Sequence, residues 1–344
     1  MDQQYFQAVD KILTDGTWQL NKRTGQECCT YPGITMEFDL QFGFPAPTTK
    51  PIAWKSVTGE WVGFIRGVTS AADFRALGSK VWDGNANETP VWLANPFRYG
   101  PDDLGDVYGA MWRKWPAYIK ADRVYSSAQR DRLLATGWRE SLDIDDDNLA
   151  GYEKEIDQVA DCIRKLILTP SDRRILFTGW NPAILDQIAL PPCHMTYQFV
   201  PNIQKRELSL VMFQRSADYG LGIPFNVAEC GLWLHLMSLL CGYRPKRLVI
   251  TTGDSHIYRE HMPALREQRA REPRPLPKLL IDARIPNYQQ MLFEEGQDII
   301  ANEAAKQRVV QRAIEWLDKI EPSDFVLADY DPHPKLENEM KMAV

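Results

Sequence analysis

An apolar segment from about residue 225 to 241 constrains the fold more than any other feature, because it predicts a long helix set between strands. Strands are expected before this helix, at 174–180, 193–200 and 207–213, and another follows it at 246–251. Elements in this mixed order favour an α+β fold over the regular alternation of a parallel βαβ sheet. Of the 344 residues, 44% are hydrophobic, which is enough to build a large core.

Shorter patterns predict the remaining elements. Apolar residues spaced three and four apart predict helices at 3–14, 54–66 and about 149–167, and alternation predicts a strand at 34–40. Residues 85–103 are rich in Asn, Pro, Asp and Gly, so they predict an irregular loop.

Near the end of the chain, residues 289–319 are charged and have a helical pattern without a proline. No internal repeat or low-complexity linker divides the sequence. Residues 1–344 are therefore expected to form a single catalytic domain.

Composition excludes several classes of protein. The net charge of −6 argues against a nucleic-acid surface, which needs a basic face, although a few clustered arginines can still bind a small anion. The six cysteines lack metal-ligand spacing and predict free thiols in a reducing compartment. No signal peptide is visible, and no uninterrupted apolar run is long enough to cross a bilayer. We therefore expect a cytoplasmic protein with no metal site and neither a membrane nor a nucleic acid as partner.

Two adjacent residues, Cys193 and His194, form the first candidate reactive group. A single cysteine is most often a small buried hydrophobic residue. Here a proton carrier stands beside it, and several arginines could favour the thiolate, which is a good nucleophile toward an electron-poor ring carbon.

The second candidate group follows about twenty residues later and contains Arg215, Ser216 and Asn226. Asn226 can be read as a helix N-cap, because it precedes an apolar helix. Its amide also carries one donor and one acceptor, so it can match O4 and N3–H of uracil together. Both roles can hold at once.

Together these two segments resemble the thymidylate synthase family, including its nucleotide hydroxymethylase relatives. The resemblance recurs from residues 21–25 to residues 342–344. It implies a mixed β-sheet covered by helices, with added segments near 85–103, 116–150 and 288–320.

The resemblance implies a role for each group around the pyrimidine. Cys193 would add to C6 of dUMP, and Asn226 would select dUMP over dCMP, for which family members carry Asp. Glu60 and His194 would order a water network and serve as general acid and base, and Tyr108 would help to remove the C5 proton. By themselves, a helical Glu and a lone Cys are ordinary features.

The phosphate and ribose of dUMP are assigned by the same resemblance. The subunit that holds the nucleotide would bind the phosphate, and the opposite subunit of a homodimer would add a pair of arginines that are otherwise typical of a solvated surface. The expected residues are Arg23, Arg215 and Ser216 from the same subunit, Arg173 and Arg174 from the opposite one, and His256 and Tyr258 for the ribose.

The cosubstrate implied by the resemblance is 5,10-methylenetetrahydrofolate, whose flat pterin suits an aromatic residue and a carboxylate. It would be both carbon donor and reductant, so neither a metal nor a nicotinamide is expected. The expected binding residues are Trp82, Asn85, Asp218, Leu221, Gly222 and Val344. Asp218 is also counted with the catalytic residues, and the tail from residue 331 resembles a mobile closing segment.

The expected reaction is the reductive methylation of dUMP to dTMP, with dihydrofolate as the second product. A phage-type dUMP hydroxymethylase, in which water replaces the hydride, stays open because the sequence departs from the family at Gly63, Val68 and Glu229. Trp82 and Val344 favour the reductive ending, since both would help to exclude water. A non-catalytic protein that binds nucleotide or RNA is the distant alternative.

Overall fold

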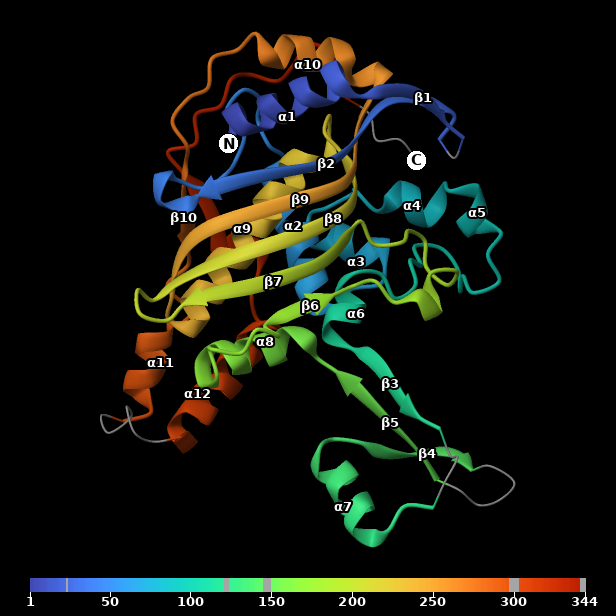
Figure 1. Ribbon diagram of the computed structural model, residues 1–344, viewed down its shortest axis with the longest axis vertical. Helices are drawn as coiled ribbons and strands as arrows, with labels where there is room; N and C mark the ends of the chain where they lie inside the picture. The colour runs from blue at the N-terminus through green and yellow to red at the C-terminus, as the bar shows by residue number, and fades with distance from the viewer. Residues whose placement is uncertain (23, 121–123, 145–149, 297–302, 341–344) are drawn as a thin grey trace.

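A six-stranded mixed sheet forms the centre of the computed structural model (Figure 1), which describes residues 1–22, 24–120, 124–144, 150–296 and 303–340. The strand order is β1-β2-β9-β8-β7-β6. The strands are β1 (Thr17–Asn21), β2 (Gln26–Asp39), β6 (Leu176–Thr178), β7 (His194–Asn202), β8 (Glu207–Asp218) and β9 (Arg244–Tyr258). The pair β8 and β9 is parallel and the other neighbours are antiparallel, so the predicted α+β class is confirmed.

The predicted apolar helix is α9 (Gly222–Cys241), and it forms the core against one face of the sheet. It is long and apolar enough to span a membrane, but 78% of it is buried inside the protein. Helix α2 (Trp54–Arg66) packs beside it, with the Trp61 and Trp233 rings 5.7 Å apart at a steep angle. Figure 1 shows both helices behind the sheet.

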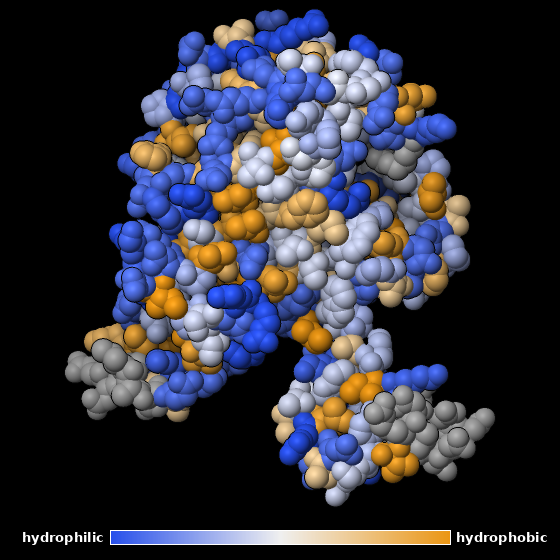
Figure 2. Space-filling view, viewed as in Figure 1, coloured by the Kyte–Doolittle hydropathy of each residue, from blue (hydrophilic) through white to orange (hydrophobic). Residues whose placement is uncertain are grey.

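On the opposite face of the sheet, over β7 and β8, Figure 1 draws no helix among the described residues. One row across the sheet on this face consists of Thr35, Thr251, Phe213 and Thr196, joined by strand register. Phe213 is 40% exposed although it is a large aromatic residue. Figure 2 shows hydrophobic residues gathered at the middle of this face.

The remaining helices surround the sheet. They are α1 (Asp2–Asp15), α3 (Ala71–Ala76), α4 (Asp83–Asn87), α5 (Pro90–Leu93), α6 (Gly109–Arg113), α8 (Gln158–Leu168), α10 (Met262–Arg269), α11 (Tyr288–Glu294) and α12 (Glu303–Trp316). A two-stranded sheet pairs β10 (Lys278–Ile281) with β11 (Phe325–Ala328).

A second sheet projects from the body as an arm (Figure 1). It has the order β3-β5-β4 and carries one helix. The arm elements are β3 (Trp115–Ile119), α7 (Ser127–Ala135), β4 (Arg139–Ile144) and β5 (Ala150–Ile156).

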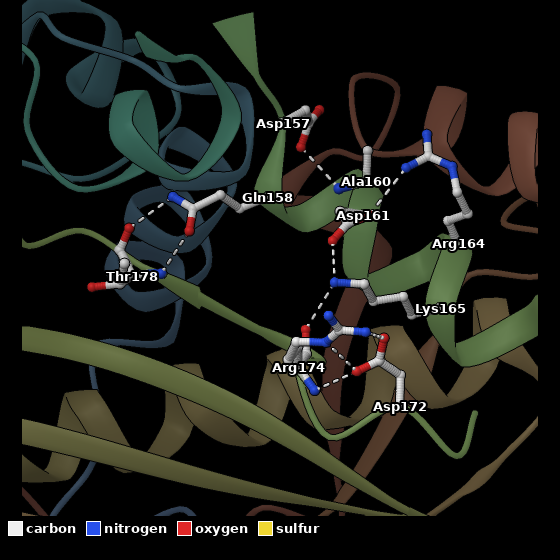
Figure 3. Close-up of polar contacts among 9 residues, drawn as sticks. All are labelled: Asp157, Gln158, Ala160, Asp161, Arg164, Lys165, Asp172, Arg174 and Thr178. Atoms are coloured by element: carbon white, nitrogen blue, oxygen red, sulfur yellow. Dashed lines mark hydrogen bonds and ion pairs between the residues drawn. The ribbon is translucent and has the colours of Figure 1, made fainter. Parts of the chain in front are cut away.

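The predicted helix at 149–167 is wrong in its first half, where the chain forms β5 and pairs with β3 and β4. The true helix, α8, begins after Asp157, whose side chain accepts a hydrogen bond from the Ala160 N–H at 2.8 Å (Figure 3). An aspartate is a common N-cap residue, and the predicted helix wrongly continued on both sides of it.

Other boundaries also differ from the predictions. The expected loop at 85–103 contains two short helices, α4 and α5. The expected helix at 289–319 is two helices, α11 and α12, while residues 297–302 lie outside the described residues. The strand predicted at 34–40 begins already at Gln26, because its first half pairs with both β1 and β9.

Candidate active site

Cys193 is the only one of the six cysteines that is not buried. It directly precedes β7, and its backbone N–H donates to the Tyr108 hydroxyl at 2.8 Å. The Arg215 guanidinium lies 3.8 Å from its sulfur. The one cysteine that is not buried therefore has a positive charge beside it.

Arg215 is fixed to the loop that leads into Cys193. Its Nε donates to the Pro192 carbonyl at 2.8 Å and its Nη2 to the Pro191 carbonyl at 2.7 Å. The guanidinium also lies over the Trp180 ring, 5.3 Å from its centre. These contacts hold the cation at the nucleophile, a proximity that the sequence spacing did not predict.

Tyr108 has a backbone conformation that non-glycine residues rarely adopt, with φ 37° and ψ −93° at the start of α6. Such strain persists where the surrounding packing enforces it, often at functional sites. The ring stacks on Phe64, with centroids 4.9 Å apart, and meets the His194 ring edge-on at 5.6 Å. Burial raises the pKa of Tyr108, so it stays a neutral hydroxyl.

His194 is buried on β7 and its Nδ1 forms a 2.8 Å hydrogen bond with the Tyr197 hydroxyl. Burial lowers the pKa of His194 to about 4, against the opposing effect of a hydrogen bond with Asn226. His194 is thus a neutral imidazole at physiological pH.

Asn226 lies in the first turns of α9, with its side-chain oxygen held in place. The Gln214 amide donates to Asn226 Oδ1 at 3.0 Å and to the Ser216 carbonyl at the same distance. The N-cap of α9 is Leu221, so the N-cap interpretation of Asn226 is wrong. Its side chain instead takes part in hydrogen bonds with Gln214, His194 and Glu229.

Glu60 comes from α2 and accepts a hydrogen bond from Trp82 Nε1 at 3.0 Å. Burial raises the pKa of Glu60 to about 7, although hydrogen bonds with Glu229 and Trp82 act to lower it. A carboxyl group with such a pKa can both give and take a proton near neutral pH.

On the cosubstrate side, Asp218 ends β8 and Gly222 begins α9, next to Leu221. Asp218 accepts from the Gly220 N–H at 2.8 Å and lies 3.5 Å from His261 Nδ1. Burial acts to raise the pKa of Asp218, but His261, His256 and the Gly220 N–H outweigh it and lower the pKa.

His256 and Tyr258, the pair predicted to bind the ribose, lie at the end of β9. His256 Nδ1 is 3.1 Å from an Asp254 oxygen, and its ring meets the Tyr258 ring edge-on at 5.3 Å. Both aromatic residues are buried, and His256 contributes to the electrostatics of Asp218.

Several predicted residues are not joined to this cluster by any contact among the described residues. Arg173 and Arg174 are exposed, and Arg174 forms a bidentate pair with Asp172 at 2.9 Å (Figure 3). Asn85 is half-buried in α4. The predictions for Arg23 and Val344 lie outside the described residues.

Lys50 is a site residue that the sequence analysis missed. Its Nζ donates to the Gly220 carbonyl at 3.0 Å and lies 3.8 Å from Met340 Sδ in the C-terminal tail. Burial lowers the pKa of Lys50 to about 8, against the attraction of Asp218 and Asp2. Nothing in its local sequence distinguishes it from a surface lysine.

Gln214 and Tyr197 were missed as well. Gln214 lies two residues from Ser216 along β8, so strand periodicity could have placed both on one face. Tyr197 is three residues from His194, and the two meet because the register of β7 shifts between His194 and Thr196, which the sequence pattern does not reveal. Glu229 was noted only as a departure from the family, and its neighbours are visible only in the fold.

Comparison with known proteins gives one consistent result. The sequence model of the family described as thymidylate synthase matches residues 3–344. A thymidylate synthase of Bordetella parapertussis is 46% identical over 335 residues, covering 97% of this chain and 98% of that one. The enzyme of the same name from Pseudomonas syringae pv. tomato is 47% identical with the same coverage. A bifunctional dihydrofolate reductase-thymidylate synthase of Zea mays is 36% identical over 99% of this chain and 54% of its own.

Proposed function

This chain belongs to the thymidylate synthase family and its function is that of a thymidylate synthase, a methyltransferase, and we propose that it converts dUMP to dTMP through a thiolate adduct on Cys193. The folate cosubstrate, 5,10-methylenetetrahydrofolate, would supply both the carbon and the hydride. The single observation that carries the proposal is the partial exposure of Cys193, with the Arg215 guanidinium 3.8 Å from its sulfur and the Tyr108 hydroxyl bound to its backbone N–H.

The thiolate of Cys193 would form a bond to C6 of the uracil ring, and the electron pair of the C5–C6 double bond would move toward O4. Asn226 supports this step. Because Gln214 donates to its Oδ1, the oxygen is fixed where it can accept from uracil N3–H while the NH₂ group donates to O4. Cytosine has the reverse pattern of donors and acceptors at this edge.

Glu60 and Tyr108 are proposed to handle the protons. Glu60 has a pKa suited to exchange near neutrality, and the neutral Tyr108 hydroxyl lies within reach of the Cys193 backbone. Trp82 is buried and hydrogen bonded to Glu60, and this apolar wall favours a reductive ending over attack by water.

The phosphate would bind Arg215 and Ser216, with Arg23 beside them and with Arg173 and Arg174 from a second subunit. We infer a homodimer that buries the helix-free sheet face. The exposure of Phe213 in the middle of that face supports this inference, because a monomer has little reason to expose it. A cytoplasmic location stays a prediction.

The folate would lie between Trp82 and Asp218, with Leu221, Gly222, Asn85 and the terminal Val344 around it. The donor set fits a pterin, since a buried tryptophan offers a flat surface and Asp218 offers an acceptor for the ring N–H groups. Lys50 adds a cation near the same edge.

The product mass tests this proposal. Incubation of the protein with dUMP and methylenetetrahydrofolate should give dTMP and a rise in dihydrofolate absorbance. A hydroxymethyl product without dihydrofolate would assign the hydroxymethylase reaction instead.

The Cys193→Ala variant should lose at least about a thousandfold in kcat while still binding dUMP. Cys162→Ala is the matched control, because Cys162 is a buried thiol remote from these contacts. Turnover that survives in Cys193→Ala would exclude the adduct.

A further inference from the structure

Glu229 is a buried acid on the apolar helix α9. It is only 2% exposed and follows Asn226 by three residues, so the two side chains lie on the same side of the helix. A glutamate is rarely buried to this extent unless another group stabilises it.

The polar groups near Glu229 do not include a cation. The groups that set its protonation are Glu60 on α2 and Asn226 on its own helix. Tyr197 on β7 and the neighbouring Cys230 also face it, and both are neutral at physiological pH because burial raises the pKa of each. No basic side chain of the described residues is among its partners.

Glu229 Oε1 is buried and has no donor among the described residues. Its nearest ionisable partner, Glu60, is another carboxyl group, and the two are within hydrogen-bonding reach. Two carboxylates have only acceptor atoms, so they can hydrogen bond only if one of them carries a proton. The contact therefore requires a shared proton.

The two carboxyl groups differ in their surroundings. Glu60 receives the Trp82 N–H, which stabilises a carboxylate, whereas no N–H of the described residues reaches Glu229 Oε1. Burial and the charge of Glu60 raise the pKa of Glu229 well above its ordinary value. The proton of the pair thus resides mainly on Glu229, as in other coupled carboxyl pairs where one member stays neutral.

We propose that Glu229 is a positioning residue whose carboxylic acid donates a hydrogen bond to Glu60 and holds Glu60 as a carboxylate in the pyrimidine site. Glu60 then has two fixed donors, Trp82 Nε1 and the Glu229 hydroxyl. A hydrogen bond also joins Asn226 to Glu229, which links the residue proposed to read uracil to the residue proposed to move the proton. The proposal rests on the proton-transfer role proposed for Glu60.

Two variants separate the hydrogen bond from simple packing. Glu229→Gln keeps the shape and a permanent donor, whereas Glu229→Met keeps the length but removes the donor. Ser238→Ala is the matched control, since Ser238 is another buried polar residue of α9 without a hydrogen-bond partner among the described residues.

Kinetics as a function of pH give the first readout. In Glu229→Met the acidic limb of kcat should move up by about one to two pH units, because a hydrogen bond to a charged group has about that value. Activity near neutrality should then fall about ten- to a hundredfold and recover as the pH rises. Glu229→Gln should lose no more than about threefold and keep the limb, and Ser238→Ala should match the parent.

Infrared spectroscopy gives a second readout that needs no turnover. The carbonyl stretch of a protonated carboxylic acid should be present in the unmodified enzyme and in Glu60→Gln, and absent from Glu229→Gln. The proposal is overturned if this band persists in Glu229→Gln, or if the Gln and Met variants show the same pH limb. Failure of the unmodified enzyme to make dTMP would instead refute the proposed reaction, and the infrared result would still decide where the proton lies.

Discussion

Two acids of the candidate site, Asp218 and Glu229, differ in their neighbours, and the comparison shows what decides their charge. Asp218 has His261 at 3.5 Å and the Gly220 N–H at 2.8 Å, so its pKa falls despite burial. Glu229 has a second carboxyl group instead, so its pKa rises. Burial acts to raise the pKa of both acids, and the neighbouring groups decide whether the net shift is downward or upward.

The largest effect is expected when the charged acid is neutralised. Asp218→Asn removes the carboxylate that lies 3.5 Å from His261 Nδ1 and should cost about 1–3 kcal/mol of the free energy of unfolding, whereas Glu229→Gln should cost less because Glu229 is already neutral. Urea denaturation of both variants measures the difference. Equal losses of unfolding free energy in the two variants would contradict a charged Asp218 and a neutral Glu229.

The stability of the protein should also depend on pH through Glu60, the carboxyl group that contacts Glu229. Glu60 has a pKa of about 7 in the folded protein against 4.5 when unfolded, so the folded state binds more protons in that window and stability falls as pH rises through it. The expected slope is about 1.4 kcal/mol per pH unit for each such group. His194, with a pKa of about 4, acts in the opposite direction up to about pH 6.5, so the decline should emerge above that pH.

Glu229→Gln should flatten the decline at higher pH, because the second carboxyl group no longer has to ionise. The folded pKa of Asp218 is lowered, so its contribution is present above its unfolded pKa and is lost as pH falls through the folded value. Thermal unfolding midpoints across the pH range measure both trends. A Glu229→Gln curve parallel to that of the parent would contradict the assignment of the proton.

The smallest effect on stability is expected at Asp172, whose partner Arg174 is exposed. Asp172 holds Arg174 in a bidentate pair, and its pKa is lowered to about 2, yet the Arg174 side chain is 83% exposed, so solvent weakens the pair. Asp172→Asn should leave the unfolding midpoint unchanged. If Arg174 serves the opposite subunit, the KM for dUMP should fall by about twofold, as the guanidinium becomes free to bind phosphate. A raised KM would argue that Asp172 presents the arginine.

Helices and strands with a strong periodic pattern of their own were predicted well from the sequence. Helix α2 begins and ends at the predicted residues, and the long apolar helix and the strands around it are present, because each has a strong periodic pattern. The boundary at Asp157 failed, since strand β5 owes its form to pairing with β3 and β4 rather than to its own pattern.

The candidate site was predictable in its residues and not in its contacts. The sequence identifies Cys193 as the candidate nucleophile, but the position of Arg215 beside it depends on the junction of β7 and β8. In the sequence, Glu229 stood out only as a departure from the family. Its meaning depends on a contact between α2 and α9, which are far apart in the sequence.

The register of the central sheet has a consequence for biosynthesis. Strand β2 leaves the ribosome early, yet its neighbour β9 lies in the last third of the chain, where Cys28 pairs with Tyr258. Until then one edge of β2 is open to wrong partners, and α9 has no complete sheet to cover. Folding should therefore be slow and concluded only after nearly all of the polypeptide has emerged, which makes this protein a natural client for chaperones that shield nascent chains.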